Sequence, residues 1–287
     1  MNNDRLLYRR GILPLVASGF FLRTSGIALR IIEQADGWQI LFYRSLAMRV
    51  TILLILVFQK GSRVIDEFRG LEWNDCLLAV FLGTGFVAYV FALLYNTVAN
   101  ALFIFSCAPF VAGFLGWILL GERVATRTWF TIGVAMAGLT VMVGSELAVS
   151  RFLGTLIALW IPIAYAASII VIRSSKRENM LAALCLAGLV SGGLSAIFVN
   201  DYALTLKDLI ISLYLGVFQA GVGFTLVVLG TRYIPAAQVG LLALVEPLFA
   251  PIWVWWGIGE IPSTFTILGG LLIFLAILSD GLVRKKP

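Results

Sequence analysis

Apolar stretches long enough to cross a membrane recur along nearly the whole chain, and this spacing constrains the fold more than any other feature. A helix needs about 20 apolar residues to cross a hydrocarbon core roughly 30 Å thick. Short connections separate ten such stretches: residues 11–32, 38–58, 74–94, 98–120, 129–145, 152–172, 181–199, 209–230, 235–258 and 263–280. The sequence therefore predicts an all-α integral membrane protein of ten transmembrane helices, with no separate soluble domain.

The composition agrees with a chain that lies mostly in lipid. Of its 287 residues, 61% are hydrophobic and 13% are charged, and the mean hydropathy is +1.00. Soluble domains average about 45–50% apolar and about 25% charged residues. Arg5, Arg9 and Arg10 precede the first apolar stretch as in a secretory signal, but no clear small-x-small cleavage site follows. We therefore expect the first helix to be retained.

Basic residues are distributed unequally between the two sets of connecting segments. If the N-terminus is cytoplasmic, the inside segments hold 15 Lys and Arg residues, and the outside segments hold only Arg151 and Lys207. Short cytoplasmic loops of membrane proteins carry such an excess. The sequence thus predicts that both termini are cytoplasmic, and this topology accounts for the net charge of +6 without a nucleic-acid partner.

The chain contains an internal repeat at an offset of 138 residues. The segment GTGFVAYVFALLYNTVANALFIFSCAPFVAGFLGWILLGE, residues 83–122, aligns without a gap with GVGFTLVVLGTRYIPAAQVGLLALVEPLFAPIWVWWGIGE, residues 221–260. Both contain Gly-x-Gly-Phe, a proline and a final Gly-Glu pair. This predicts two five-helix repeats, residues 1–147 and 148–287, around a central cavity. Because five is odd, the second repeat is inverted in the membrane, as in transporters that work by alternating access.

Each half also places a glutamate thirteen residues after a proline, in a Gly-Glu pair at the end of its fourth helix, and EPLFAPIWVWWGIGE contains the second copy. In these motifs the chain resembles the EamA-type drug/metabolite transporter (DMT) superfamily, and within it the bacterial amino acid exporters, including the aromatic amino acid exporter branch. The resemblance implies a secondary transporter of the bacterial cytoplasmic (inner) membrane that exports amino acids or related small metabolites. It also implies a cavity lined mainly by the first, third, fourth, sixth, eighth and ninth helices.

Three alternatives to amino acid export fit a chain of this composition. A transporter of drugs or organic cations would need acidic and aromatic side chains around its cavity. A transporter of nucleotide-linked sugars would need more cavity arginines for phosphate. The third alternative is an intramembrane enzyme or scaffold that does not transport.

Catalytic and metal-binding motifs are missing from the sequence. The chain contains no histidine, which excludes a histidine base, an H-E-x-x-H zinc motif and a Ser-His-Asp triad, and it has neither a Walker A nor a dinucleotide-binding loop. Cys76, Cys107 and Cys185 are scattered in apolar stretches without metal-ligand spacing. We therefore expect a non-enzyme without metal or cofactor, whose partners are a small-molecule substrate and the lipid bilayer.

Glu246 is an ionisable residue in the middle of the ninth apolar stretch, directly before Pro247. Such a group is costly in a bilayer unless it is paired, hydrated or protonated, and it is a candidate functional site by default. Its repeat partner is Ala108, so the repeated fold does not require it. In a structural role, Glu246 pairs with a buried arginine such as Arg44 or Arg23, or is protonated and bonded to a neighbouring helix. In a functional role, it contacts a substrate ammonium or carries a coupling proton. Arg44 in turn either extends to the interface or attracts a substrate carboxylate.

Aromatic and polar side chains in the predicted helices supply the other substrate-binding candidates. Amides and hydroxyls suit the polar groups of an amino acid, and rings suit an aromatic substrate, although Trp and Tyr near helix ends also form interfacial belts. Together with Glu246, the cavity candidates are Phe86, Tyr89, Asn100, Ser106, Trp160, Tyr165, Phe218, Gln219, Phe224 and Gln238. Residues that favour close helix contact or bending are Gly83, Gly85, Pro162, Gly221 and Gly223.

Overall fold

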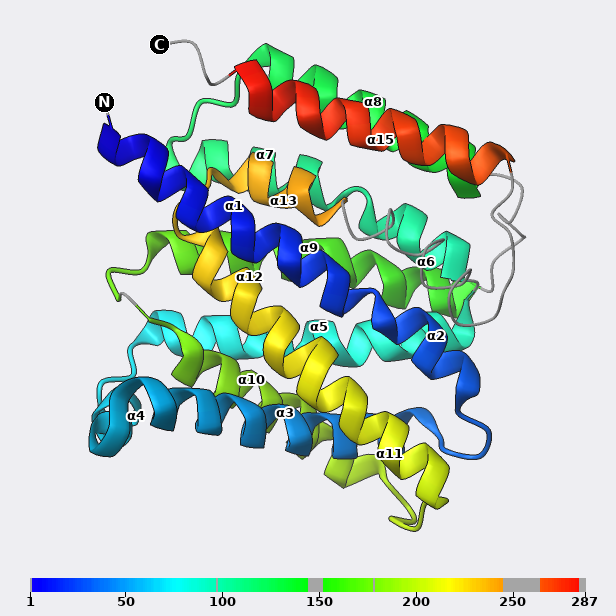
Figure 1. The fold of residues 1–287 in the computed structure, drawn as a ribbon. Helices are drawn as coiled ribbons and strands as arrows, with labels where there is room; N and C mark the ends of the chain where they lie inside the picture. Colours follow the sequence, from blue (N-terminus) through cyan, green and yellow to red (C-terminus); the bar gives the residue numbers. More distant parts are fainter. Residues whose placement is uncertain (1, 97, 144–151, 178, 245–263, 284–287) are drawn as a thin grey trace.

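The structure, a computed structural model, describes residues 2–96, 98–143, 152–177, 179–244 and 264–283, and all regular structure in these ranges is helical (Figure 1). The predicted all-α class is therefore confirmed. The helices are α1 (Asn2–Leu22), α2 (Thr24–Ile31), α3 (Gly37–Lys60), α4 (Val64–Arg69), α5 (Trp73–Tyr95), α6 (Val98–Phe105), α7 (Ala108–Leu120), α8 (Thr126–Val143), α9 (Phe152–Ser174), α10 (Leu181–Phe198), α11 (Leu206–Tyr214), α12 (Phe224–Thr231), α13 (Ala236–Ala243) and α15 (Thr264–Val283), with a 3₁₀ turn η1 (Gly61–Arg63) and a π-helix η3 (Leu215–Gly223).

Several predicted apolar stretches are divided into shorter helices. The first is divided at Arg23 into α1 and α2, and the fourth is divided at Ser106 into α6 and α7, with Pro109 in the first turn of α7. The eighth stretch runs through α11, η3 and α12. The ninth begins as α13, but residues 245–258, which include Glu246, lie outside the described ranges.

Six segments in the described ranges are long and apolar enough to cross a membrane: Gly37–Arg69, Trp73–Tyr95, Phe103–Leu120, Phe152–Ser174, Leu181–Phe198 and Leu206–Thr231. Arg10–Leu22 and Thr264–Ser279 are shorter apolar helices. The chain is therefore a membrane protein with several apolar helices. The predicted count of ten crossings also includes residues that the structure does not describe.

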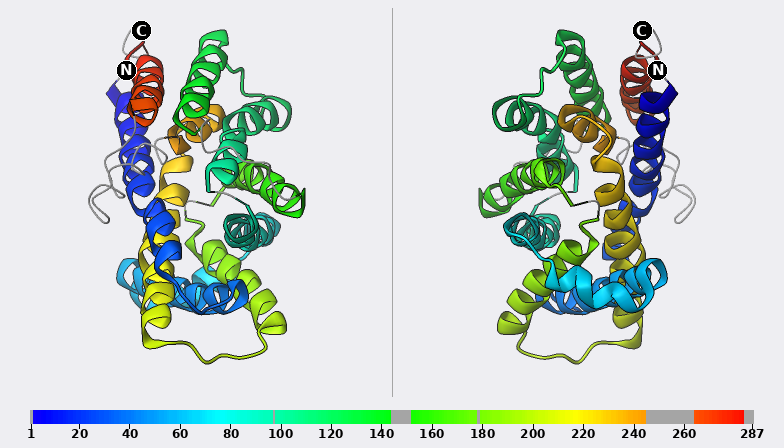
Figure 2. Two further views of the ribbon diagram at one scale, coloured as in Figure 1. Left: turned by 90° about the vertical axis from the view of Figure 1, so that its right-hand side faces the viewer. Right: turned by 90° about the vertical axis from the view of Figure 1, so that its left-hand side faces the viewer.

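Helices from the two halves of the chain pack against each other (Figures 1 and 2). The pair α8 and α15 forms one edge of the bundle, and α3 with α10 lies toward the opposite edge. Between these edges α5 packs on α9, α7 on α13, and α1 on α12, while α5 also contacts α10 and η3 contacts α3. The most extensive interhelical contacts therefore join one half of the chain to the other.

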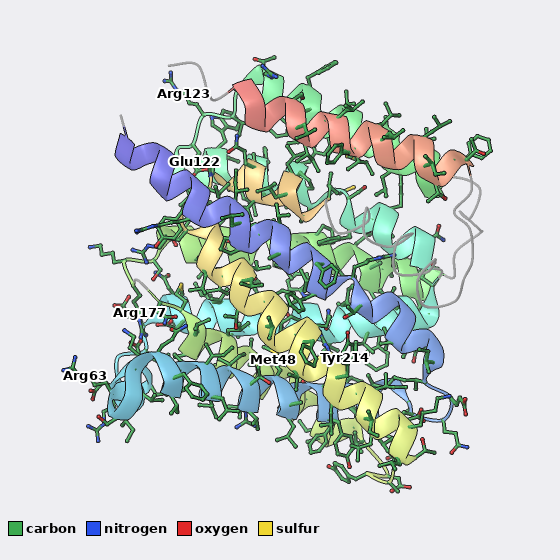
Figure 3. All side chains as sticks on the ribbon, in the orientation of Figure 1. Met48, Arg63, Glu122, Arg123, Arg177 and Tyr214 are labelled. Carbon is green, nitrogen blue, oxygen red and sulfur yellow. The ribbon has the colours of Figure 1, made fainter. Side chains whose placement is uncertain are left out.

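The two ends of the bundle carry different connections. Helix α1 begins and α15 ends at the same end, on the left in Figure 1. Arg63, Arg123 and Arg177 also lie at this end, which we name the basic end (Figure 3). The connections from α2 to α3 and from α10 to α11 lie at the opposite end. The start of the first helix and the end of the last one thus lie beside the basic connections.

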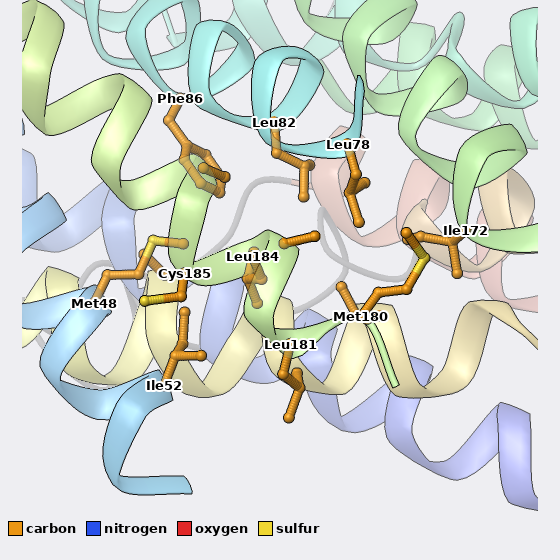
Figure 4. Close-up of a cluster of buried hydrophobic side chains, with 14 of the residues drawn as sticks. Met48, Ile52, Leu78, Leu82, Phe86, Ile172, Met180, Leu181, Leu184 and Cys185 are labelled. Carbon is orange, nitrogen blue, oxygen red and sulfur yellow. The ribbon is translucent and has the colours of Figure 1, made fainter. Parts of the chain in front are cut away.

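A cluster of buried apolar side chains joins α3, α5, α9 and α10 (Figure 4). Its members include Met48 and Ile52 from α3, Leu78 and Leu82 from α5, and Leu184 from α10. Lipid tails are as apolar as these side chains, so helix association in a bilayer gains mainly from van der Waals contact. Close packing therefore matters more here than removal of apolar surface from water.

The predicted packing glycines of the first half lie where α5 approaches its neighbours. A Cβ added at Gly83 would lie 2.7 Å from the Cβ of Val190 on α10. A Cβ added at Gly85 would lie 3.3 Å from the Cβ of Ala164 on α9. Small residues at such positions let two helices approach closely.

The second half has the corresponding contacts. Cβ atoms added at Gly221 and Gly223 would lie 2.9 Å from Thr51 on α3 and 3.1 Å from Leu22 on α1, respectively. In each half, therefore, the first glycine of Gly-x-Gly faces the second long helix of the other half. The second glycine faces the first helix of the other half.

Two fully buried aspartates hold connecting segments at opposite ends of the bundle, and each is the third residue of its helix. At the basic end, Asp75 accepts a hydrogen bond from Nη1 of Arg177 at 2.8 Å, and Glu67 accepts one from Nη2 at 2.9 Å. At the other end, Asp208 accepts hydrogen bonds from the backbone N–H groups of residues 33–35 at 3.0 to 3.1 Å. Asp75 thus fixes the connection from α9 to α10, and Asp208 fixes the connection from α2 to α3. In both cases the aspartate and the connection belong to different halves of the chain.

Replacing Asp208 by Ala should leave the N–H groups of residues 33–35 without their acceptor. Hydrogen bonds to charged groups contribute about 1.5–3 kcal/mol, and water can replace part of this set because residues 33 and 34 are exposed, so we expect the free energy of unfolding to fall by about 2 kcal/mol. Thermal unfolding in detergent measures this loss. Asp201→Ala is the matched control, because the Asp201 side chain is exposed and, among the described residues, accepts a hydrogen bond from the Ala203 N–H alone. Equal stability of the two variants would contradict the role given to Asp208.

Candidate substrate site

A pocket lies between α1, α3, α5, α6, α9 and the segment formed by η3 and α12. Binding sites for small molecules usually have mostly apolar walls and a few polar groups. This pocket has that character, because Arg44 and Gln219 are set among apolar and aromatic residues: Leu22, Phe81, Leu82, Gly85, Phe86, Tyr89, Phe105, Ile161, Ala164, Tyr165 and Phe224.

Arg44 is the charged residue of this pocket, and it is only 3% exposed. Its Nε donates a hydrogen bond to Oε1 of Gln219 at 3.0 Å, and its Cζ lies 5.0 Å from the ring centroid of Phe86. Its Nη2 is buried without a hydrogen-bond partner, and Arg44 forms no ion pair with any carboxylate in the described ranges. The side chain thus lies inside the bundle and does not extend to the interface.

The π-helix η3 brings Gln219 to Arg44. In a π-helix the backbone hydrogen bonds span five residues, and such segments are frequent at functional sites. Where η3 crosses α3 it carries Gly216, and a Cβ added there would overlap the backbone oxygen of Arg44 and lie 2.5 Å from the Cβ of Ala47. Only glycine permits this approach, which sets the depth at which Gln219 meets the guanidinium group.

Aromatic rings form much of the pocket wall. Phe86 and Phe224 pack edge to face with ring centroids 4.6 Å apart. Phe105 and Tyr165 pack in the same manner at 5.4 Å. These rings present both apolar surface and aromatic faces to the pocket, which suits a substrate with an apolar or aromatic side chain.

Carboxylates in the described part of the chain lie outside the pocket lining. Glu122, for example, lies at the basic end, where its Oε1 accepts a hydrogen bond from Nε of Arg173 at 2.7 Å and its Oε2 accepts the Ala236 N–H at 2.9 Å. This glutamate therefore joins the end of α7 to α9 and to the start of α13. The described residues also contain no group of three His, Cys, Asp or Glu residues that is arranged to hold a metal ion.

The pocket brings together seven of the residues predicted from the sequence. Tyr89 is held in this wall by a hydrogen bond of 2.8 Å between its hydroxyl and that of Ser25. Arg44 belongs to the second predicted helix, which was not among the helices expected to line the cavity. The ninth predicted helix was expected to line it, but none of its described residues does. The seven residues are Arg44, Gly85, Phe86, Tyr89, Tyr165, Gln219 and Phe224.

The other predicted residues lie elsewhere. Trp160 is 37% exposed and donates a hydrogen bond to Oγ1 of Thr84 at 3.0 Å, and Phe218 is 42% exposed and packs on Tyr214. Both therefore lie on outward faces of their helices. Glu246 is outside the described ranges. The remaining predicted residues, all buried but not in the pocket lining, are Gly83, Asn100, Ser106, Pro162, Gly221, Gly223 and Gln238.

Some wall residues were not predicted, and helical spacing would have indicated part of them. Leu82 lies four residues before Phe86, and Ile161 lies four residues before Tyr165, so each extends a predicted helical face by one turn. Phe105, at the end of α6, contributes where the fourth stretch is divided. Apolar length alone does not indicate such a division.

Comparison with known proteins places these features in a family of transporters. Residues 9–144 and 152–279 match the EamA-like transporter family. The pseudopaline exporter CntI of Pseudomonas aeruginosa is 24% identical over an alignment 296 positions long. The alignment covers 97% of this chain and 98% of that protein. An uncharacterized transporter of Archaeoglobus fulgidus is 26% identical over 206 residues, which cover 70% of this chain and 73% of that protein.

A solved structure shares the fold. A crystal structure of another protein superimposes with a TM-score of 0.79 at 17% sequence identity, and the match covers 100% of this chain and 99% of that chain. At this level of identity the likeness concerns the fold alone.

Replacing Gly216 by Ala should push η3 away from α3, because the added methyl group would overlap the backbone of Arg44. We expect the free energy of unfolding to fall by about 1–3 kcal/mol, the usual cost of overpacking, as measured by thermal unfolding in detergent. Gly193→Ala on α10 is the matched control, since nothing lies within 4 Å of a Cβ added there. If both variants unfold at the same temperature, the proposed contact is wrong.

Proposed function

The chain belongs to the EamA-like transporter family, and we propose that it is a secondary exporter of amino acids, including aromatic ones, or of related small metabolites. The observation that carries this proposal is Arg44, a buried guanidinium group whose Nη2 has no hydrogen-bond partner in the described part of the chain. Arginine binds carboxylates through strong, directional hydrogen bonds. The proposal therefore assigns the substrate carboxylate to Arg44.

The energetics of Arg44 favour an anionic group in the pocket. A buried donor without a partner costs about 1–3 kcal/mol, and more if it is charged. Gln219 accepts the Nε hydrogen bond but is neutral, so it leaves the positive charge of Arg44 uncompensated. A substrate carboxylate would supply both the missing acceptor and the missing charge. An organic cation would instead be repelled, which argues against the drug or cation alternative.

The remaining parts of an amino acid fit the other residues of the site. The rings of Phe86, Tyr165 and Phe224 suit an apolar or aromatic side chain. Glu246 is our candidate for contact with the substrate ammonium or with a coupling proton, as an ionisable residue in an apolar stretch. Arg44 and Glu246 would then bind the two charged ends of one substrate.

We also propose that two inverted five-helix repeats provide alternating access to this pocket. Helix contacts support this. At the offset of 138 residues, α5 corresponds to η3 with α12, α9 corresponds to the region of α1, and α10 corresponds to α3. The contact of α5 with α9 thus has its counterpart in that of α12 with α1, and the contact of α5 with α10 in that of η3 with α3. The contacts of Gly83 and Gly85 correspond in the same way to those of Gly221 and Gly223. In such architectures one repeat rocks against the other around a central substrate site.

The basic end is our candidate for the cytoplasmic side of a bacterial inner membrane. Arg63, Arg123 and Arg177 lie at the end where α1 begins and α15 ends, in agreement with the rule that cytoplasmic loops are basic. Both termini would then be cytoplasmic. The relative from Pseudomonas aeruginosa is named an exporter, which supports outward movement of the substrate.

Counterflow in liposomes tests the proposed function directly. Purified protein is reconstituted with an unlabelled amino acid inside, and uptake of labelled aromatic and aliphatic amino acids is measured. Saturable exchange would support the proposal, and the ranking of substrates would identify the side chain that the pocket prefers. Exchange of organic cations or nucleotide-linked sugars alone would favour those alternatives. Folded protein that exchanges none of these solutes would favour an intramembrane enzyme or scaffold.

Replacing Arg44 by Gln should lower the transport efficiency, kcat/KM, by about 10- to 100-fold, because hydrogen bonds to charged groups contribute about 1.5–3 kcal/mol. Inhibition of counterflow provides a second readout. An amino acid should inhibit the unchanged protein more strongly than its carboxamide does, and Arg44→Gln should lose this preference. The control is Arg63→Gln, an exposed arginine at the basic end. A retained preference in Arg44→Gln would place the carboxylate elsewhere.

Replacing Glu246 by Gln should separate its two candidate roles. If Glu246 carries a coupling proton, the variant should keep counterflow but lose the stimulation of net transport by a pH gradient. If it contacts the substrate ammonium, the KM should rise while the response to the gradient persists. Asp66→Asn, at an exposed position of the basic end, controls for the loss of one negative charge. Wild-type behaviour of Glu246→Gln in both assays would contradict both roles.

A further inference from the structure

A second cavity lies at the basic end and shares no lining residue with the pocket of Arg44. The middle of α1, the end of α9, the connection from α9 to α10, and the end of α12 with the two residues that follow it surround this cavity. Met180 and Val228 contribute buried apolar surface, and Arg10, Arg177 and Arg232 bring three guanidinium groups to the lining. The cavity is therefore a candidate site of its own.

The positive charge of this cavity is only partly compensated. Burial works against the charge of Arg177, but its hydrogen bonds and ion pairs with Asp75 and Glu67 outweigh burial and raise the pKa of the guanidinium. Among the residues that the structure describes, no carboxylate belongs to the cavity lining. The side chains of Arg10 and Arg232 form neither a hydrogen bond nor an ion pair with any residue in the described ranges. Two guanidinium groups thus remain without an anionic partner there.

We propose that this cavity binds a phosphate group, and that the membrane supplies it as the headgroup of an anionic phospholipid. Arg10, Arg232 and the hydroxyl of Tyr233 are donors of the kind that phosphate oxygens accept. Basic hollows between transmembrane helices are known sites for anionic headgroups. The apolar wall formed by Met180 and Val228 suits the glycerol and the first acyl carbons of a lipid. This proposal does not depend on the identity of the transported substrate.

The internal repeat indicates that the fold itself does not require this charge. At the offset of 138 residues, Tyr233 corresponds to Tyr95, but Arg232 corresponds to Leu94. The end of the third predicted helix thus has an uncharged residue where the end of the eighth has an arginine. Arg232 is one of the basic residues of the inside segments, so its position follows the positive-inside rule and places its charge on the side of the anionic leaflet.

Lipid binding to the purified full chain tests the proposal. Native mass spectrometry and thermal unfolding are followed after addition of phosphatidylglycerol, phosphatidylcholine or inorganic phosphate. The unchanged protein should retain phosphatidylglycerol and unfold at a higher temperature with it than with phosphatidylcholine. The double variant Arg10→Gln/Arg232→Gln should bind phosphatidylglycerol with an affinity lower by at least about tenfold, because the lost hydrogen bonds to a charged group account for at least this factor. Arg63→Gln/Arg69→Gln removes two exposed positive charges from the same end and is the matched control.

The outcomes distinguish the source of the phosphate. Stabilisation by phosphatidylglycerol but not by inorganic phosphate supports a lipid site, whereas stabilisation by both would assign the cavity to a free phosphate anion. Equal binding of both lipids, or equal weakening in the two double variants, would overturn the proposal. Arg10→Lys/Arg232→Lys keeps the charges and should bind with intermediate affinity, and it replaces the glutamine variant if that variant does not fold.

Discussion

Close backbone approach at glycines is the interaction on which this bundle depends. Apolar side chains in a bilayer gain little from leaving lipid for protein, so contacts between helices require small residues at the crossing points. Gly83 and Gly221 provide such contacts between the two halves, and Gly216 lets η3 touch the backbone of α3 beside Arg44. The same packing that holds the halves together thereby fixes the position of the guanidinium group and of Gln219.

Polar groups are treated differently at the ends and in the middle of the molecule. At the ends, the buried carboxylates of Asp75 and Asp208 are bound by an arginine and by backbone N–H groups. In the pocket, Arg44 has only an amide and a ring as partners among the described residues, and one of its nitrogens bonds to neither. Oδ1 of Asp75 is also buried without a hydrogen-bond partner, but Asp75 is paired with Arg177, whereas Arg44 has no ion pair among the described residues. Under the proposed function, a substrate carboxylate would complete the bonding of Arg44.

Hydropathy predicted the positions of the helices well, because the length of an apolar stretch is set by the thickness of the membrane. It did not predict the divisions near Arg23 and Ser106, since apolar length says nothing about a turn within it. Residue type also did not distinguish side chains that line the pocket from side chains on the outer surface, because both surroundings are apolar. Trp160 and Phe218 were therefore grouped with residues that line the pocket. The contact of Arg44 with Gln219 comes from the π-helix, and no residue pattern in the sequence indicates that backbone change.

The two aspartates that hold the ends differ in the charge of their partners, and this sets their response to dissolved salt. At the basic end Asp75, Glu67 and Arg177 form a network of full charges, and Glu67 also pairs with Lys60, whose side chain is 41% exposed. At the opposite end Asp208 binds neutral N–H groups, and the exposed pair of Lys207 with Glu33 supplies full charges beside it. Mobile ions screen exposed charges and screen buried pairs much less. Rising ionic strength therefore weakens the exposed pair at each end and leaves the buried carboxylates of Asp75 and Asp208 as the contacts that still join the connections of the two halves.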